Sequence, residues 1–531
     1  MESRIQMFNR IKSFFYRCMR PIKKFSCEIG PLPPIARRVK AFIIRVKASK
    51  LHKKMRFQSL TCNGDEKRYP NKIASFSKAL PHNDLGEVDL DAYNQYIKAL
   101  KSGDPDDFER IPLGGERKLV NPQAAYAYEM AGPDSHQLVT PPPPVFSSAE
   151  AAGEMVELYW LALCRDVPFT DYDTDPLTME AAEDLTNLSD FRGPKIDGKV
   201  TSKTLFRGDI QGALVGPYIS QFLWKDVPYV SNTVAQRYQT TIPNDDHLIS
   251  YPNWLAVQNG SAPPTFNEFD PIPRYIRNIR DLAEYVHRDI TVEDGLTAGL
   301  ILLSFGEEAW DSNNPYLNSD TQLGFSTFGA PHVLDFVTRA ARPGLEAAWF
   351  QKWLVHRRLR PEQFGGRIHN ELIGAADYPI HPDVLNSKAV TRIFEKYDTY
   401  LLPQAYEEGC PTHPSFPAGH GTFIGAMVTM LKAFFDESYV IPSPVVASSD
   451  GLSLEPYEGS PLTVGGELNK LAMNVALGRD GAGVHYSSEG LNSLQLGEQV
   501  AMGILRDYRK TYNEQFEGFC LTKFDGTTIT I

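Results

Sequence analysis

The chain has 531 residues, 42% of them hydrophobic and 22% charged, so it is globular and long enough to bury a large core. Its net charge of −11 is uneven, because residues 1–60 hold sixteen lysines and arginines against two acidic residues. The acidic remainder argues against a general nucleic-acid binder, which needs a basic surface. The six cysteines show no CxxC spacing, so free thiols are expected rather than a disulfide framework.

The first 65 residues differ from the rest in charge. They are basic and rich in aromatic residues, and they contain no long apolar region followed by a small-residue cleavage site, so a secretory signal is not expected. The alternatives are a targeting segment, an amphipathic surface helix and an arm outside the core. The sequence does not identify the cellular compartment. We predict residues 1–65 as a separate basic segment and residues 66–531 as one large helical domain.

Helical periodicity dominates the remainder of the chain. After four prolines, Ser147 and Glu150 predict a capping box for a helix that runs to about Arg165. Apolar residues at three- and four-residue steps predict further helices at 177–188, 275–289, 292–304 and 330–360, and several more beyond 390. Strand patterns are confined to short pieces at 199–206 and 526–531. Since no run reaches eighteen apolar residues, we predict no transmembrane segment and an all-α fold with small β-hairpins at its edges.

Two segments combine histidine or basic residues with helix ends. "KWLVHRRLRP" carries Lys352 and Arg360 near the end of a predicted helix. "HPSFPAGHGTFIGA" begins at His413 and turns through Gly419 into a helix that starts near His420. The N-terminus of a helix favours an anion through its free N–H groups and its dipole, and a histidine there can exchange a proton with that anion.

A third segment, "GRDGAGVHYSSEG", places Arg479 at a helix end and His485 six residues later, beyond a glycine-rich turn. The arginine offers a planar fork of donors to an oxyanion, and the histidine could be a nucleophile or a ligand. Taken singly, each segment also has an ordinary explanation, such as a solvated basic face or a capped loop. Their occurrence together is what indicates a site for a small, highly charged anion.

In order along the chain, the three segments read Lys-x7-Arg-Pro, Pro-x-Gly-His and Arg-x5-His. This pattern resembles the vanadium-dependent haloperoxidases and the related type 2 phosphatidic acid phosphatase superfamily. Seven residues between the Lys and the Arg, and the motif "HPSFPAGH", are similar to bromoperoxidases of red algae and cyanobacteria, whereas the phosphatases usually have six. The likeness covers about residues 70–515. It implies two four-helix bundles, an active-site bundle at about 325–510, and a homo-oligomer.

The resemblance also implies a cofactor and a set of residues that bind it. The cofactor would be vanadate, with His485 as its metal ligand. Its oxygens would accept hydrogen bonds from Lys352, Arg360, Arg479 and the N–H of Gly419. One position departs from the family pattern, because Ala418 stands where a serine is usual. The missing hydroxyl predicts weaker cofactor binding or altered peroxide chemistry.

The implied reaction is the oxidation of bromide or iodide by hydrogen peroxide to hypohalous acid, which halogenates a small organic acceptor. By resemblance, His420 would be the acid–base catalyst and Lys352 would polarise the peroxide. His413 would set the halide, because bromoperoxidases of this family carry histidine at that position. Arg357 and Arg358 are expected to avoid direct contact with the anion, and His356 to be a packed side chain.

Two other functions stay open at this point. In an acid phosphatase of the same superfamily, His485 would attack phosphorus and His420 would protonate the leaving group. A non-catalytic anion-binding scaffold would retain the basic residues, and Ala418 would then be the first residue of the catalytic pattern to be lost.

A further prediction concerns the loop Asp311 to Asp320, "DSNNPYLNSD", which concentrates oxygen ligands. These would suit a calcium ion, although Asx-turn chemistry accounts for the composition equally well.

Overall fold

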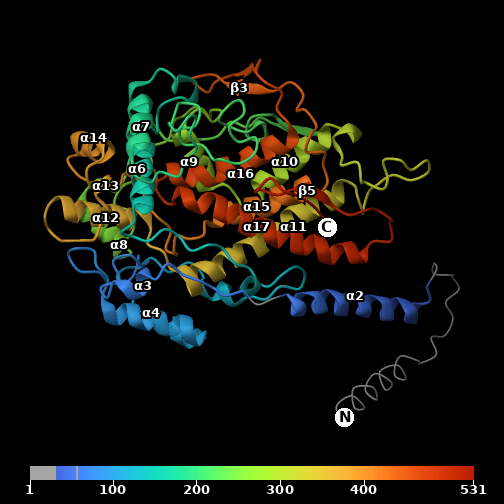
Figure 1. Ribbon diagram of the computed structural model, residues 1–531, viewed down its shortest axis with the longest axis horizontal. Helices are drawn as coiled ribbons and strands as arrows, with labels where there is room; N and C mark the ends of the chain where they lie inside the picture. Colours follow the sequence, from blue (N-terminus) through green and yellow to red (C-terminus); the bar gives the residue numbers. More distant parts are fainter. Residues whose placement is uncertain (1–31, 56–57) are drawn as a thin grey trace, which may run out of the picture. The chain divides into compact units, whose positions relative to one another are not determined.

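The computed structural model describes residues 32–55 and 58–531, which fall into two units, residues 1–56 and 57–531 (Figure 1). In the first unit, helix α2 (Pro34–Lys54) has no buried residue. Residues 1–31 and 56–57 of the predicted basic segment, 1–65, lie outside the described residues. Within the part of the chain that is described, no helix is both long and apolar enough to cross a membrane.

Helices are the main regular elements of the second unit, with long loops between them. They are α3 (Asp65–Arg68), α4 (Leu90–Ser102), α5 (Pro105–Phe108), α6 (Ala149–Leu163), α7 (Pro176–Asn187), α8 (Tyr251–Gln258), α9 (Ile279–Arg288), α10 (Glu293–Ser304), α11 (Ala330–Phe350), α12 (Pro361–Leu372), α13 (Pro382–Leu385), α14 (Lys388–Tyr397), α15 (Gly419–Lys432), α16 (Val464–Gly481) and α17 (Ser487–Tyr508). The strands form three antiparallel pairs: β1 (Val227–Tyr229) with β2 (Asn232–Val234), β3 (Val445–Ala447) with β4 (Leu454–Pro456), and β5 (Cys520–Thr522) with β6 (Thr528–Thr530). The predicted all-α fold with small hairpins is confirmed.

Two groups of helices organise this unit. In one, α6 packs against α7, α13 and α14. In the other, α15 packs between α11 and α17, and also touches α10 and α16 (Figure 1). Glycines allow the closest approach: a Cβ atom at Gly425 would lie 2.5 Å from the carbonyl oxygen of Leu494, and one at Gly497 would lie 2.0 Å from that of Thr422. Helix α15 is therefore held deep in the core, and only His420 among its residues is not buried.

Two local predictions are wrong. The N-cap of α6 is Ser148, whose Oγ accepts from the N–H of Ala151 at 3.1 Å, so the helix begins one residue later than the proposed Ser147 box. Residues 199–206 form turns instead of a strand. Short alternating stretches are weak evidence for a strand when no partner strand lies alongside. The C-terminal strand is present as β6.

The segment after α3 runs alongside the chain that precedes α12. The N–H of Phe76 donates to the carbonyl of Arg357 at 2.9 Å. The ammonium of Lys78 donates to the Glu362 carboxylate at 2.9 Å, and both side chains are fully buried. The Arg357 guanidinium donates to Glu66 at 2.6 Å. These contacts fix the chain on both sides of Arg360.

Candidate active site

Lys352 and Arg360 reach one site from two different elements. The sequence predicts both residues on one helix over residues 330–360, and this is wrong. Helix α11 ends at Phe350 and continues as a π-helical segment, η6 (Gln351–His356), which holds Lys352. Arg357 then adopts a left-handed conformation with φ of 44°, and Arg360 becomes the N-cap residue of α12. π-helical turns are frequent at functional sites, and here the turn redirects the chain between the two cations.

The guanidinium of Arg360 joins two of the predicted histidines. It donates to the carbonyl of His413 at 2.8 Å and to Nδ1 of the same ring at 2.9 Å. It also donates to the carbonyl of Val484 at 2.7 Å and to Nε2 of His485 at 3.1 Å. All these contacts are buried, so the geometry brings together the first, second and third motifs.

The other two cations contact main-chain carbonyls and an aromatic ring. Lys352 donates to the carbonyls of Pro414 at 2.8 Å and Ser415. Arg479, near the end of α16, donates to the carbonyl of Val286 at 2.8 Å and stacks over the ring of Tyr406 at 5.1 Å. The Nε atom of Arg479 is buried and has no hydrogen-bond partner in the described part of the chain. A buried donor left open in this way is suited to an acceptor atom of a bound anion.

The N-terminus of α15 supplies the remaining predicted groups. Gly419 is its first residue and packs close to the Trp349 ring, where a Cβ atom would lie 3.3 Å from the indole. The Nε2 atom of His420 bonds to Oδ1 of Asp289 at 3.0 Å, while its Nδ1 atom has no hydrogen bond within the described residues. Burial lowers the pKa of His420, and Asp289 opposes that shift.

The charges gathered at the site favour an anion. Lys352, Arg360 and Arg479 are buried, and none of them pairs with a carboxylate in the described structure. Burial, and secondarily Arg360, lowers the pKa of Lys352 well below its usual range. Since unpaired buried charge is costly, three such cations together indicate a site built for negative charge. Of the seven other buried cations in the described residues, Arg367 donates to main-chain carbonyls, those of Leu85 and Gly86. The other six each pair with a carboxylate: Lys78, Arg165, Arg280, Arg358, Lys432 and Lys470.

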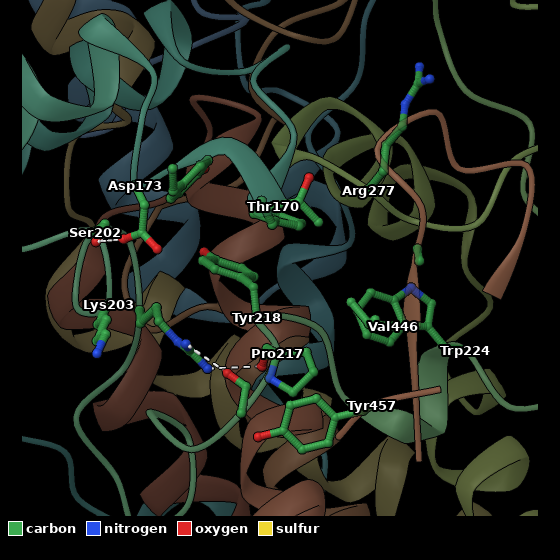
Figure 2. Close-up of a pocket in the computed structure, with 15 residues that line it drawn as sticks. Thr170, Asp173, Ser202, Lys203, Pro217, Tyr218, Trp224, Arg277, Val446 and Tyr457 are labelled. Atoms are coloured by element: carbon green, nitrogen blue, oxygen red, sulfur yellow. Dashed lines mark hydrogen bonds between the residues drawn. The ribbon is translucent and has the colours of Figure 1, made fainter. Parts of the chain in front are cut away.

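A separate cavity of about 380 Å³ offers a comparison (Figure 2). It is lined by aromatic side chains, among them Phe169 and Tyr218, whose rings stack 4.0 Å apart. The half-buried Arg207 in its lining donates to the carbonyls of Ala213, Gly216 and Pro217. The donors of Arg207 are thus used by the protein itself, and none of the predicted site residues lines this cavity.

Ala418 is the N-cap residue of α15 and makes no side-chain cap. We expect Ala418→Ser to tighten vanadate binding about fivefold, because one added neutral hydrogen bond contributes about 1 kcal/mol. Equilibrium dialysis of the apo-protein with vanadate measures this effect. An unchanged Kd with a higher melting temperature of the apo-protein would mean that the hydroxyl caps the helix instead of facing the anion.

The proposed calcium loop uses its oxygens internally. Oδ1 of Asp311 accepts from the N–H of Asn313 at 2.8 Å, and Oδ1 of Asn314 accepts from the N–H of Tyr316 at 3.1 Å. These are Asx turns. In the described ranges, no group of three or more His, Cys, Asp or Glu residues is arranged to hold a metal ion. Calcium at this loop stays a prediction.

Sequence reasoning missed several partners of the predicted residues. Asp289 follows α9 and reaches His420 across 131 residues of sequence, and no local pattern identifies it. Glu489 bonds to Nδ1 of His485, and here a signal existed, because the two residues are four apart at the start of a helix. Tyr406 and Trp349 complete the walls beside Arg479 and His413.

Comparisons with known proteins agree over nearly the whole chain. A family model described as the VCPO second helical-bundle domain matches residues 386–514. The vanadium-dependent bromoperoxidase of Ascophyllum nodosum is 36% identical over 94% of this chain and 95% of its own length. That of Corallina officinalis is 35% identical over 94% of this chain and all of its own. The homohexameric structure of the second vanadate-dependent bromoperoxidase from A. nodosum superposes with a TM-score of 0.88 at 28% identity, covering 96% and 95% of the two chains. The chain therefore belongs to the family of the vanadium-dependent bromoperoxidases.

Proposed function

We propose that this protein is a vanadium-dependent haloperoxidase that oxidises bromide and iodide with hydrogen peroxide, giving hypohalous acid and water. The observation that carries the proposal is a group of three buried cations around His485, none of them paired with a carboxylate in the described residues. Arg360 contacts the Nε2 atom of His485 at 3.1 Å, and burial, together with the charges of Arg360, Lys352 and Arg479, lowers the pKa of His485. A small organic acceptor would then be halogenated by the product.

The donor set fits vanadate, a compact oxyanion that accepts a nitrogen ligand. In this proposal His485 holds the metal through Nε2. Lys352, Arg360, Arg479 and the N–H of Gly419 hold the oxygens and neutralise their charge. Bound vanadate would supply a Lewis acid that activates peroxide without changing its oxidation state. His420, oriented by Asp289, moves a proton through its Nδ1 atom, and Lys352 places a positive charge beside the peroxide.

His413 is proposed to set the halide preference. Its ring lies 4.8 Å from that of Trp349, and its Nδ1 atom accepts from Arg360. We expect His413→Phe to lower the ratio of bromide to chloride turnover, because the apolar ring cannot bond to Arg360 and alters the surroundings of the halide. Steady-state rates with each halide at saturating peroxide measure the ratio. An unchanged ratio, with vanadate Kd as the control for site integrity, would contradict this role.

One experiment separates the candidate functions. The apo-protein is reconstituted with vanadate and tested for bromide- and iodide-dependent halogenation of a dye in the presence of peroxide. The apo form is tested in parallel with p-nitrophenyl phosphate. Halogenation that requires vanadate supports the proposal, whereas phosphate ester turnover without halogenation supports a phosphatase. Vanadate binding with neither activity supports an anion-binding scaffold.

The assembly is proposed to be a homo-oligomer. This rests on the homohexameric bromoperoxidase structure from A. nodosum, which covers nearly the whole chain. Light scattering on the purified protein measures the subunit number, and a monomer at micromolar concentration would contradict the proposal.

A further inference from the structure

Helix α2 carries a positive charge that the proposed function does not use. It contains eight lysines and arginines and no aspartate or glutamate. Several of these cations are neighbours on the helix surface, because Lys47 and Lys50 lie three residues apart and Lys50 and Lys54 lie four apart. Like charges at these spacings repel each other and destabilise a helix. An anionic partner would therefore stabilise α2.

One side of the first three turns of α2 is apolar. Its residues follow steps of three and four along the chain: Ile35, Val39, Phe42, Ile43 and Val46. On a helix this spacing forms an apolar stripe, here about 17 Å long. No residue of α2 is buried, and Phe42 is 66% exposed. The apolar stripe is thus open to a partner with an apolar interior.

Basic side chains flank the apolar stripe on both sides. At about 100° per residue, Arg38 and Arg45 lie beyond one edge of the stripe, and Lys40 and Lys47 lie beyond the other. Long basic side chains bury their stems along apolar surface while their charged ends stay in water. A helix of this kind suits a surface that is anionic at its outer layer and apolar just beneath it.

We propose that α2 binds the surface of an anionic lipid bilayer, with its axis in the membrane plane. The apolar stripe would lie among the acyl chains and the flanking cations would lie at the headgroups. An acidic protein surface would attract the same cations but would leave the apolar stripe in water, unless it also held an apolar groove. Residues 61–531 carry a net charge of −25, so an anionic membrane would attract only the N-terminal segment.

The test is co-sedimentation of the full-length protein with lipid vesicles. One set is phosphatidylcholine alone, and the other contains about one-third phosphatidylserine. We expect the protein to bind the second set more tightly, and binding to weaken as salt is added, because salt screens exposed charges. Wild type that binds neither set, or binds both equally, would overturn the inference.

The triple variant Lys40→Gln/Arg45→Gln/Lys47→Gln tests the charges. Each lysine or arginine near a membrane surface contributes about fivefold to affinity, so we expect the three changes to lower it about 100-fold. Phe42→Ser/Ile43→Ser keeps every charge and interrupts the apolar stripe, and we expect a loss of about tenfold or more. The seven lysines and arginines of residues 1–31 stay in place, so the differences report on α2 alone.

The matched control is Lys101→Gln/Lys199→Gln/Lys203→Gln, which removes the same charge from exposed positions of the second unit. Its vesicle affinity should not fall. All variants should keep the wild-type melting temperature, because none of the changed side chains is buried. Equal losses of affinity in the two triple variants would overturn the inference. So would an α2 variant that binds vesicles as wild type does but forms smaller assemblies by light scattering, because α2 would then contact a second copy of the chain.

Discussion

Replacing His485 with alanine is expected to abolish halide oxidation. Loss of a residue that only supports a metal ligand costs about 10- to 100-fold in metal affinity. Loss of the ligand itself should lower vanadate affinity by more than this. The physical reason is that Nε2 of His485 presents a lone pair beside the buried guanidinium of Arg360, and alanine removes that ligand while leaving the cations in place. The measurements are vanadate Kd by equilibrium dialysis and bromide-dependent halogenation of a dye. Activity that survives the substitution would contradict the mechanism.

His356→Ala serves as the matched control. This histidine is also buried, packs edge-on against Phe416 at 4.8 Å, and makes no hydrogen bond through either ring nitrogen within the described residues. Burial lowers its pKa to about 3, so it is a neutral packing residue. Its substitution should lower the melting temperature and leave vanadate Kd near the wild-type value. An equal loss of affinity in both variants would mean that the loss comes from general destabilisation of the site and not from removal of a ligand.

Replacing His420 with alanine is expected to separate binding from catalysis. We expect kcat for bromide oxidation to fall by about 10²- to 10⁴-fold, the usual contribution of a positioned acid–base group. Vanadate Kd should change little, because the main-chain N–H groups at the start of α15 and the three cations remain. The measurement is kcat with vanadate held at saturation. A Kd that rises as steeply as kcat falls would instead make His420 a binding residue.

The companion variant Asp289→Asn tests how His420 is oriented. The new amide can still bond to Nε2 of His420, but the substitution removes the charge that raises the pKa of His420 against the effect of burial. The pKa of His420 should therefore fall further. The acidic limb of the kcat profile, on which His420 loses its proton as the pH rises, should move to lower pH. A profile that coincides with wild type would show that Asp289 does not act through His420.

The helices could be predicted from sequence because each keeps a regular apolar pattern and clear ends. Helices α15, α16 and α17 lie where their periodicity places them. The residues of the motifs could also be assigned to a common site, because basic residues and histidines at helix ends are all suited to binding an anion. In the structure Arg360 contacts His413 and His485, so the first motif lies against the other two.

What could not be predicted depends on contacts distant in sequence or on backbone changes that leave no periodic signal. The π-helical turn and the left-handed Arg357 break a stretch whose composition is entirely compatible with a helix. The partners of Arg358 could not be found, because Glu154 lies 204 residues away. The sequence suggested only that Arg358 avoids the anion. The structure adds the reason, which is that two carboxylates already hold it.

The pairing of residues 76–78 with the chain around Arg360 has a consequence for how the enzyme folds. The Lys78–Glu362 contact spans 284 residues and the Arg357–Glu66 contact spans 291. Contacts between residues so far apart in the sequence form late in folding, because a long loop must close before they become favourable. The anion pocket is therefore completed only after residues 66–78 have packed against the chain around Arg360. Without residues 66–78, the helical bundle would lack the ion-pair partners of Glu362 and Arg357, which lie on both sides of Arg360.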